Sequence, residues 1–121
     1  MKSSDFHDLL VWQKSMNLTA EIYRLVKLLP KEETFALSDQ MRRAVVSIPS
    51  NIAEGRGRNS DKDFIRFLSI SRGSLWELST QLEICVMLNY LTDSQIEKAK
   101  NQIEEISKMI SSLGRSFGEL Q

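Results

Sequence analysis

The chain has few of the residues that build covalent cross-links, metal sites or membrane spans. Its 121 residues include one cysteine, one histidine and two prolines. One cysteine cannot form an intramolecular disulfide, and one cysteine with one histidine is too small a ligand set for an ordinary structural zinc site. No apolar run approaches the roughly 20 residues of a membrane span, and no charged-then-apolar leader opens the sequence. We expect a cytoplasmic protein with no metal, cofactor or membrane partner.

The chain also lacks net charge, because sixteen basic residues balance sixteen acidic ones. A neutral total argues against a strong general attraction to nucleic acid. The charges are unevenly spread, however, and seven basic residues face three acidic ones between Gln40 and Arg72, a net of +4. The segments on either side are net negative. The middle of the chain therefore permits a local anionic partner.

Hydrophobic periodicity predicts an all-α protein. Apolar residues recur every three or four positions from Ile96 to Phe117, as in a heptad seam. Thr92 with Gln95 forms a capping-box pattern ahead of this helix, and Ser60 gives a weaker start signal for the one before. The predicted helices span about 9–29, 34–55, 61–89 and 93–117. With short joints between them, we expect one domain over residues 1–121, an up-down-up-down antiparallel four-helix bundle.

The second predicted helix is irregular and carries the sequence QMRRAVVSIPSNIAEGRGRNS from Gln40 to Ser60. Pro49 lacks an amide hydrogen and crowds the preceding turn, so a kink is expected there. A polar stripe also follows this helix. It is either a solvated face or a hydrogen-bonded seam, in which Arg43 and Glu54 find partners on another helix or another subunit. The stripe consists of Gln40, Arg43, Ser47, Asn51 and Glu54.

Glycines and arginines mark the end of the same helix. Gly55 and Gly57 are predicted to end it through left-handed backbone conformations. The sequence GRGRNS is neither a dinucleotide fingerprint nor a phosphate loop. Exposed amides at the start of the third helix can still hold a phosphate with help from nearby basic side chains. The candidate nucleic-acid-binding residues are Arg42, Arg56, Arg58, Lys62 and Arg66. In the third helix, Gly73 is expected to allow close approach of a neighbouring helix.

No catalytic constellation is present in the sequence. His7 lies near a terminus with no ligand role, and Cys85 lies on an apolar seam without a nearby base. The Glu-x-x-His pairs that build di-iron sites in helix bundles are missing. We therefore expect no enzymatic activity and no catalytic, cofactor or metal residues.

Three stretches together resemble the 23S rRNA intervening-sequence protein family, a widespread bacterial group. They are DLLVWQKSMNLTAEIYRLVKLLP, QMRRAVVSIPSNIAEGRGRNS and FIRFLSISRGSLWELSTQLEICVMLNYL, in that order. The resemblance runs from about Phe6 to Leu91, and the fourth helix matches in pattern more than in residues. The combination of RRA, SIPSNIAEG, GR and FL-x-I-x-RGS-x-x-EL is specific to the family.

This resemblance implies a four-helix bundle that assembles as a homopentamer around a central channel. Some members of the family are encoded inside insertions in ribosomal RNA genes. Related accessory variability proteins of diversity-generating retroelements bind nucleic acid and a reverse transcriptase through a basic surface. The family motif falls here on Arg42, Arg43, Asn51, Glu54, Gly55, Gly57 and Arg58. The neutral charge of this chain departs from the basic retroelement relatives.

Three functions remain open on the sequence. The leading hypothesis is a non-enzymatic, homo-oligomeric bundle that binds RNA or DNA, or acts as a scaffold, through the segment from Arg42 to Arg72. The alternative is a purely structural or protein-interaction bundle, in which the motif maintains the oligomer without nucleic acid. A third, less favoured reading is a bundle that binds a metal or a small molecule. The residues assigned to the structural motif are Arg43, Ser47, Pro49, Asn51, Glu54, Gly55 and Gly57.

Overall fold

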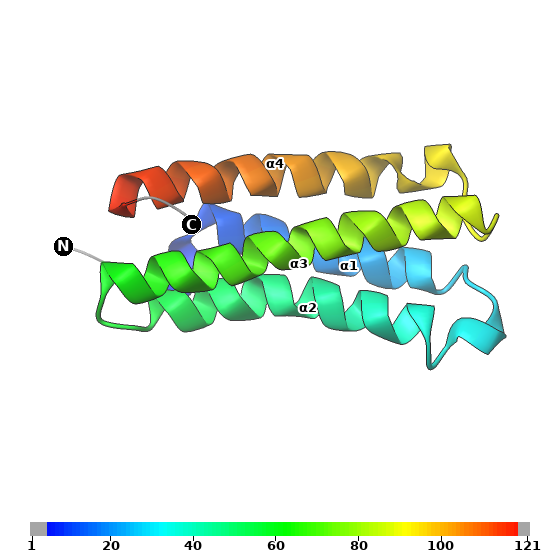
Figure 1. Ribbon diagram of the computed structural model, residues 1–121, viewed down its shortest axis with the longest axis horizontal. Helices are drawn as coiled ribbons and strands as arrows, with labels where there is room; N and C mark the ends of the chain where they lie inside the picture. Colours follow the sequence, from blue (N-terminus) through cyan, green and yellow to red (C-terminus); the bar gives the residue numbers. More distant parts are fainter. Residues whose placement is uncertain (1–4, 119–121) are drawn as a thin grey trace.

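The computed structural model describes residues 5–118, which form four long helices. They are α1 (Leu10–Val26), α2 (Leu37–Arg56), α3 (Asp61–Met87) and α4 (Asp93–Phe117), with short 3-10 turns η1 (Phe6–Asp8) and η2 (Lys31–Glu33). Consecutive helices run antiparallel along one long axis (Figure 1). The prediction of an all-α, up-down-up-down four-helix bundle is confirmed.

Two kinds of local structure shift the helix ends from their predicted positions. Before Pro30, α1 gives way to a turn with i to i+3 hydrogen bonds, and η2 delays the start of α2 to Leu37. At the other joint, α3 ends at Met87 because Asn89 adopts a left-handed φ of 63°. Asparagine tolerates this conformation better than most residues. The starts of α3 and α4 agree with the predicted caps, since Ser60 accepts from the Asp63 amide and Thr92 and Gln95 form a capping box.

The helices enclose one apolar core in a square arrangement. Both α1 and α3 pack against α2 and against α4, whereas neither diagonal pair makes close contact within residues 5–118. Each helix contributes fully buried side chains, such as Leu18, Ile48, Leu75 and Ile106. Burying one such side chain contributes roughly 1.5–3 kcal/mol. Within the same residues, no helix has the length and apolarity to cross a membrane.

The most extensive helix pair is α2 with α3, and small side chains bring these helices together. A Cβ atom built on Gly55 would lie 2.6 Å from Cβ of Phe67 and 3.1 Å from Cδ1 of Phe64. Hydroxyl groups cross the same interface. The Ser71 hydroxyl donates to the carbonyl of Ile48 at 2.9 Å, and the hydroxyl oxygens of Ser47 and Ser74 lie in hydrogen-bond contact at 2.6 Å.

The glycines do not act as the sequence predicted. Gly57 has φ −77° and ψ −9°, and among residues 5–118 Gly118 is the only glycine with positive φ. The prediction that Gly55 and Gly57 end α2 through left-handed conformations is therefore wrong. Gly57 instead continues the helical hydrogen bonds by donating to the carbonyl of Ala53 at 3.1 Å.

The expectation of close approach at Gly73 is also wrong, because this residue is exposed and a Cβ there would meet no atom within 4 Å. Gly73 lies within α3, on a side of the helix that faces outward. The close approach occurs at Gly55 instead.

These two glycines form a matched pair for a stability test. We expect Gly55→Ala to destabilise the fold by about 1–3 kcal/mol, because the new methyl group is forced into the Phe67 side chain. Gly73→Ala should stabilise it by up to about 1 kcal/mol, because alanine has the higher helix propensity and nothing occupies the space. Urea unfolding of both variants measures the difference. Equal midpoints would contradict the packing described for α2 and α3.

Candidate nucleic-acid interface

One end of the bundle gathers four of the candidate basic residues. The end of α2, the turn and the start of α3 lie there (Figure 1, green). The four residues, called here the basic cluster, are Arg56, Arg58, Lys62 and Arg66. They all fall within eleven consecutive positions, and two acidic residues, Asp61 and Asp63, lie among them.

Two arginines of the basic cluster share one aromatic ring. The guanidinium carbon of Arg66 lies 4.6 Å from the centroid of the Phe67 ring, and that of Arg58 lies 5.1 Å from it. Arg56 lies 5.9 Å from the neighbouring Phe64 ring. A guanidinium held over a ring face keeps N–H donors along its edge, where they suit a phosphate or carboxylate. The rings therefore restrict where these cations can lie without consuming all of their donors.

The competing carboxylate in this region is exposed. Arg58 donates to Glu54 at 2.8 Å, one turn back on α2, and both side chains are about half exposed. Such an i,i+4 pair contributes about 0.3–0.5 kcal/mol. An incoming phosphate can displace it at small cost.

The start of α3 is less open to an anion than the sequence implied. The hydroxyl oxygen of Ser60 accepts from the Asp63 amide at 2.9 Å, so this amide is already capped. Asp61 and Asp63 also place negative charge in the first turn. Lys62 is exposed, and it makes no ion pair with any residue in the range 5–118. At this end, side chains are therefore better placed than backbone amides to meet a phosphate.

Arg42 is not brought together with the basic cluster. It lies fourteen residues before Arg56 on α2, which is about 21 Å along the helix axis. Its guanidinium donates to the carbonyl of Thr34 at 3.0 Å and lies 3.9 Å from Asp39. In this position Arg42 ties the connection before α2 to the helix itself.

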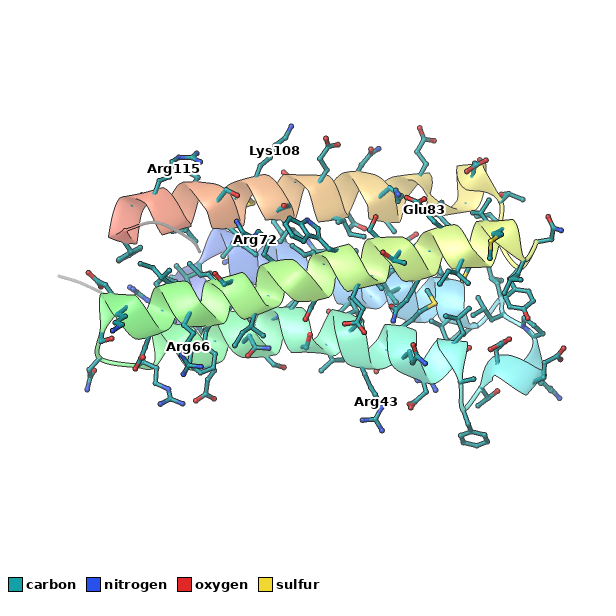
Figure 2. All side chains as sticks on the ribbon, viewed as in Figure 1. Arg43, Arg66, Arg72, Glu83, Lys108 and Arg115 are labelled. Atoms are coloured by element: carbon teal, nitrogen blue, oxygen red, sulfur yellow. The ribbon has the colours of Figure 1, made fainter. Side chains whose placement is uncertain are left out.

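The polar stripe of α2 is partly solvated and partly bonded to α3. Arg43 is 79% exposed, pairs with Asp39 at 2.9 Å and points away from the bundle (Figure 2). Asn51 donates to the carbonyl of Ser47 at 2.7 Å, and Ser47 reaches Ser74 on α3. Arg43 and Glu54 therefore find no partner on another helix among the described residues, since Arg43 pairs within α2 and Glu54 pairs with Arg58 on the turn that follows. Contact with another subunit is the part of that hypothesis that remains.

Pro49 is accommodated within a continuous α2. The helix runs unbroken from Leu37 to Arg56, with Pro49 buried. The carbonyl of Ile48, directly before Pro49, accepts the hydrogen bond from Ser71. A hydroxyl from α3 thus supports the backbone at the proline.

The candidate nucleophile and the histidine are placed as the sequence predicted. Cys85 is fully buried beside the sulfur of Met41 at 3.7 Å, and burial raises the pKa of the Cys85 thiol to about 11. A thiol with so high a pKa is a poor nucleophile at neutral pH. His7 is exposed and contacts Asp5. Residues 5–118 hold no group of three or more side chains able to bind a metal ion.

Sequence reasoning missed the aromatic half of this site. No binding role was predicted for Phe64 or Phe67, although both carry arginine guanidinium groups. The positions of Arg58 and Arg66 in the sequence gave only a weak signal for these ring contacts. A ring contact across a turn depends on the distance between the two helices. Also missed was the hydrogen bond from the Tyr90 hydroxyl to Glu33 at 2.8 Å, which joins the two connections at the opposite end.

Comparison with known proteins agrees with this fold. The family model described as 23S rRNA-intervening sequence protein matches residues 7–112. A crystal structure of a protein of unknown function from the S23 ribosomal protein family of Bacteroides thetaiotaomicron superposes with a TM-score of 0.79 and 33% identity, over 86% of this chain and 97% of that one. No match was found among curated proteins. The chain belongs to the 23S rRNA-intervening sequence protein family.

Proposed function

We propose that this chain is a non-enzymatic, self-associating helix bundle that binds the phosphate backbone of RNA or DNA through the basic cluster. The observation that carries the proposal is the pair of guanidinium groups, Arg58 and Arg66, held over the single ring of Phe67. Both guanidinium carbons lie within 5.1 Å of one ring centroid, which gives a local positive site on a chain with no net charge. Phosphate contacts of this kind supply affinity without reading sequence.

Self-association is the second half of the proposal. The stripe of Arg43, Ser47, Asn51 and Glu54 runs along one side of α2, with Arg43 and Glu54 exposed and Ser47 and Asn51 half-buried. Such a stripe suits contact with another copy of the chain, and the family resemblance implies five copies. Repetition of the basic cluster around a ring would multiply weak phosphate contacts. A low affinity in each protomer is therefore compatible with binding by the assembly.

Salt dependence tests the nucleic-acid half. Four phosphate contacts per site give a slope of about −3 for the logarithm of the binding constant against that of the salt concentration. Fluorescence anisotropy with labelled RNA and DNA oligonucleotides, starting at low salt, measures this slope. The double variant Arg56→Ala/Arg58→Ala should roughly halve it, because two contacts are lost.

The matched control is Lys108→Ala/Arg115→Ala, which removes the same charge from α4, where both side chains point away from the other helices (Figure 2). This variant should retain the full slope. Absence of binding by the unaltered protein at low salt, or equal losses in the two double variants, would refute binding through the basic cluster.

Native mass tests the self-association half. The exposed pair of Arg43 with Asp39 is worth at most about 1 kcal/mol to a single chain, so Arg43→Ala should leave the bundle folded. If the stripe joins copies, the same substitution lowers the mass seen by light scattering or native mass spectrometry, while helicity by circular dichroism is unchanged. Arg56→Ala/Arg58→Ala should leave the mass intact. An Arg43→Ala protein of unaltered mass would remove Arg43 from the interface between copies.

The alternative function, a structural or protein-interaction bundle without nucleic acid, is favoured by one specific observation. Asp61 and Asp63 lie among the four basic side chains and reduce their net charge to +2. Under this alternative function, the basic cluster contacts a protein carboxylate instead of a phosphate. The anisotropy experiment separates the two functions, since a structural bundle retains its native mass but binds neither oligonucleotide.

A further inference from the structure

Residues of α3 and α4 line a groove near the connection that joins these helices. That connection lies at the opposite end of the bundle from the turn between α2 and α3 (Figure 1). Its main hollow has a volume of about 670 Å³. Three apolar side chains line it, and three carboxylates lie among them. The apolar ones are Val86, Met87 and Ile96, and the carboxylates belong to Glu83, Asp93 and Glu97.

The groove continues along the outer side of α3. A second hollow of about 320 Å³ shares Glu83 and Met87 with the first and adds Thr80 and Ile84. Trp76 lies one turn before Thr80, so Trp76, Thr80, Glu83 and Met87 follow spacings of 4, 3 and 4 and share one helix face. We call the two hollows with this face the α3–α4 groove.

Two large apolar side chains in the α3–α4 groove are open to solvent. Met87 is 70% exposed and Trp76 is 59% exposed. Single exposed apolar residues are normal on protein surfaces, but tryptophan and methionine are enriched where proteins meet. Eleven residues separate these two, or about 16 Å along the helix. A partner helix that lies alongside α3 covers that distance in three turns.

The charges that line the α3–α4 groove determine whether it favours a positively or a negatively charged ligand. Lys100 donates to Glu83 at 2.6 Å, and this hydrogen bond lowers the pKa of Glu83. Lys100, the one cation lining the main hollow, is thereby neutralised. Asp93 and Glu97 are exposed and make no ion pair with any residue in the range 5–118. At the Trp76 end of the groove, the guanidinium carbon of Arg72 lies 5.4 Å from the centroid of the Trp76 ring. At the α4 end, an apolar floor lies beside the carboxylates of Asp93 and Glu97, and this end is complementary to a cationic, amphipathic ligand.

We propose that the α3–α4 groove binds a cationic amphipathic helix of a protein partner. Two apolar side chains of the partner, three turns apart, cover Trp76 and Met87, and its lysine or arginine side chains meet Asp93 and Glu97. An amphipathic helix lying in a groove is a recurrent mode of peptide recognition. This site lies outside the basic cluster, and nothing in its chemistry requires nucleic acid.

Neither α1 nor α2 of a second copy of this chain fits the groove well. Val46 is the one large apolar side chain of α2 that is exposed, and α1 presents Leu10, Met16 and Tyr23, six and seven residues apart. Their spacings along the helix, about 9, 10 and 20 Å, do not match the 16 Å of the groove. A partner helix with its own apolar spacing is the better occupant, and the experiment distinguishes the two.

Tryptophan fluorescence reports occupancy directly. The chain has two tryptophans, Trp12 and Trp76, so Trp12→Phe leaves Trp76 as the single reporter. The probe is a synthetic 18-residue helical peptide with leucine on one face and lysine on the other. Its matched control has glutamate in place of every lysine. The lysine peptide should shift the Trp76 emission to shorter wavelength in a saturable, salt-weakened manner, and the glutamate peptide should not.

Substitutions in the same background locate the binding. We expect Met87→Ala and Glu97→Lys each to weaken the lysine peptide by about tenfold, as at an interface anchor. The control Glu32→Lys makes the same charge change on an exposed η2 residue outside the groove and should alter affinity by less than about twofold. Circular dichroism confirms that each variant remains helical.

Three results would overturn the proposal. One is no emission shift with the lysine peptide at low salt. Another is an equal shift with both peptides, which would show apolar adhesion without charge selection. The third is a Trp76 emission that depends on protein concentration in the absence of peptide, together with a lower native mass for Trp76→Ala, because that result assigns the α3–α4 groove to contact between copies of the chain.

Discussion

The close approach of α2 to α3 at Gly55 is the contact on which the rest of the structure depends. No side chain larger than hydrogen fits there, because a Cβ atom would lie 2.6 Å from that of Phe67. This separation lets Ser71 reach the carbonyl before Pro49 and lets Ser47 reach Ser74. It also sets the turn between the helices, and therefore the distance from Arg58 on the turn to the ring of Phe67 on α3. The contact of α2 with α3 at Gly55 therefore determines both the fold and the geometry of the candidate site.

Charge separation gives this neutral protein two chemically different ends. The basic cluster lies at the turn between α2 and α3, whereas carboxylates and exposed apolar side chains line the α3–α4 groove at the far end. A balance of sixteen positive and sixteen negative charges therefore does not describe either surface. Local fields act over about 10 Å at ordinary ionic strength, so each end presents its own field. The two proposals together assign an anionic partner to one end and a cationic partner to the other.

Much of the fold follows from the sequence, because helix periodicity and capping are local. The seam from Ile96 to Ile110 is buried as predicted, and the caps at Ser60 and Thr92 begin their helices. The predicted helix ends were less accurate at two places, where Asn89 adopts a left-handed conformation and where the turn η2 precedes α2. Gly55 and Gly73 were misjudged in opposite directions. Periodicity assigns a residue to a face but says nothing of the distance to the next helix.

The candidate site was predictable in its charges but not in its geometry. Clustering of Arg56, Arg58, Lys62 and Arg66 follows from their proximity in sequence, and the turn keeps them together. Their contacts with Phe64 and Phe67 depend on how closely two helices pack, which no local pattern encodes. Arg42 looked equivalent in composition but is tied to the Thr34 carbonyl at the other end of α2. Residue type alone could not separate these environments.

Amide hydrogen exchange tests the central claim, that α2 and α3 are joined as one unit up to the turn that carries the basic cluster. Helix ends ordinarily fray and exchange through local opening. If the contact of Gly55 with Phe67 fixes this end, the amides in the last two turns of α2 and from Phe64 onward in α3 should exchange only through global unfolding, as slowly as those at the centre of the core. Exchange of these amides by local opening, well ahead of the amides around Ile48 and Leu75, would contradict the account.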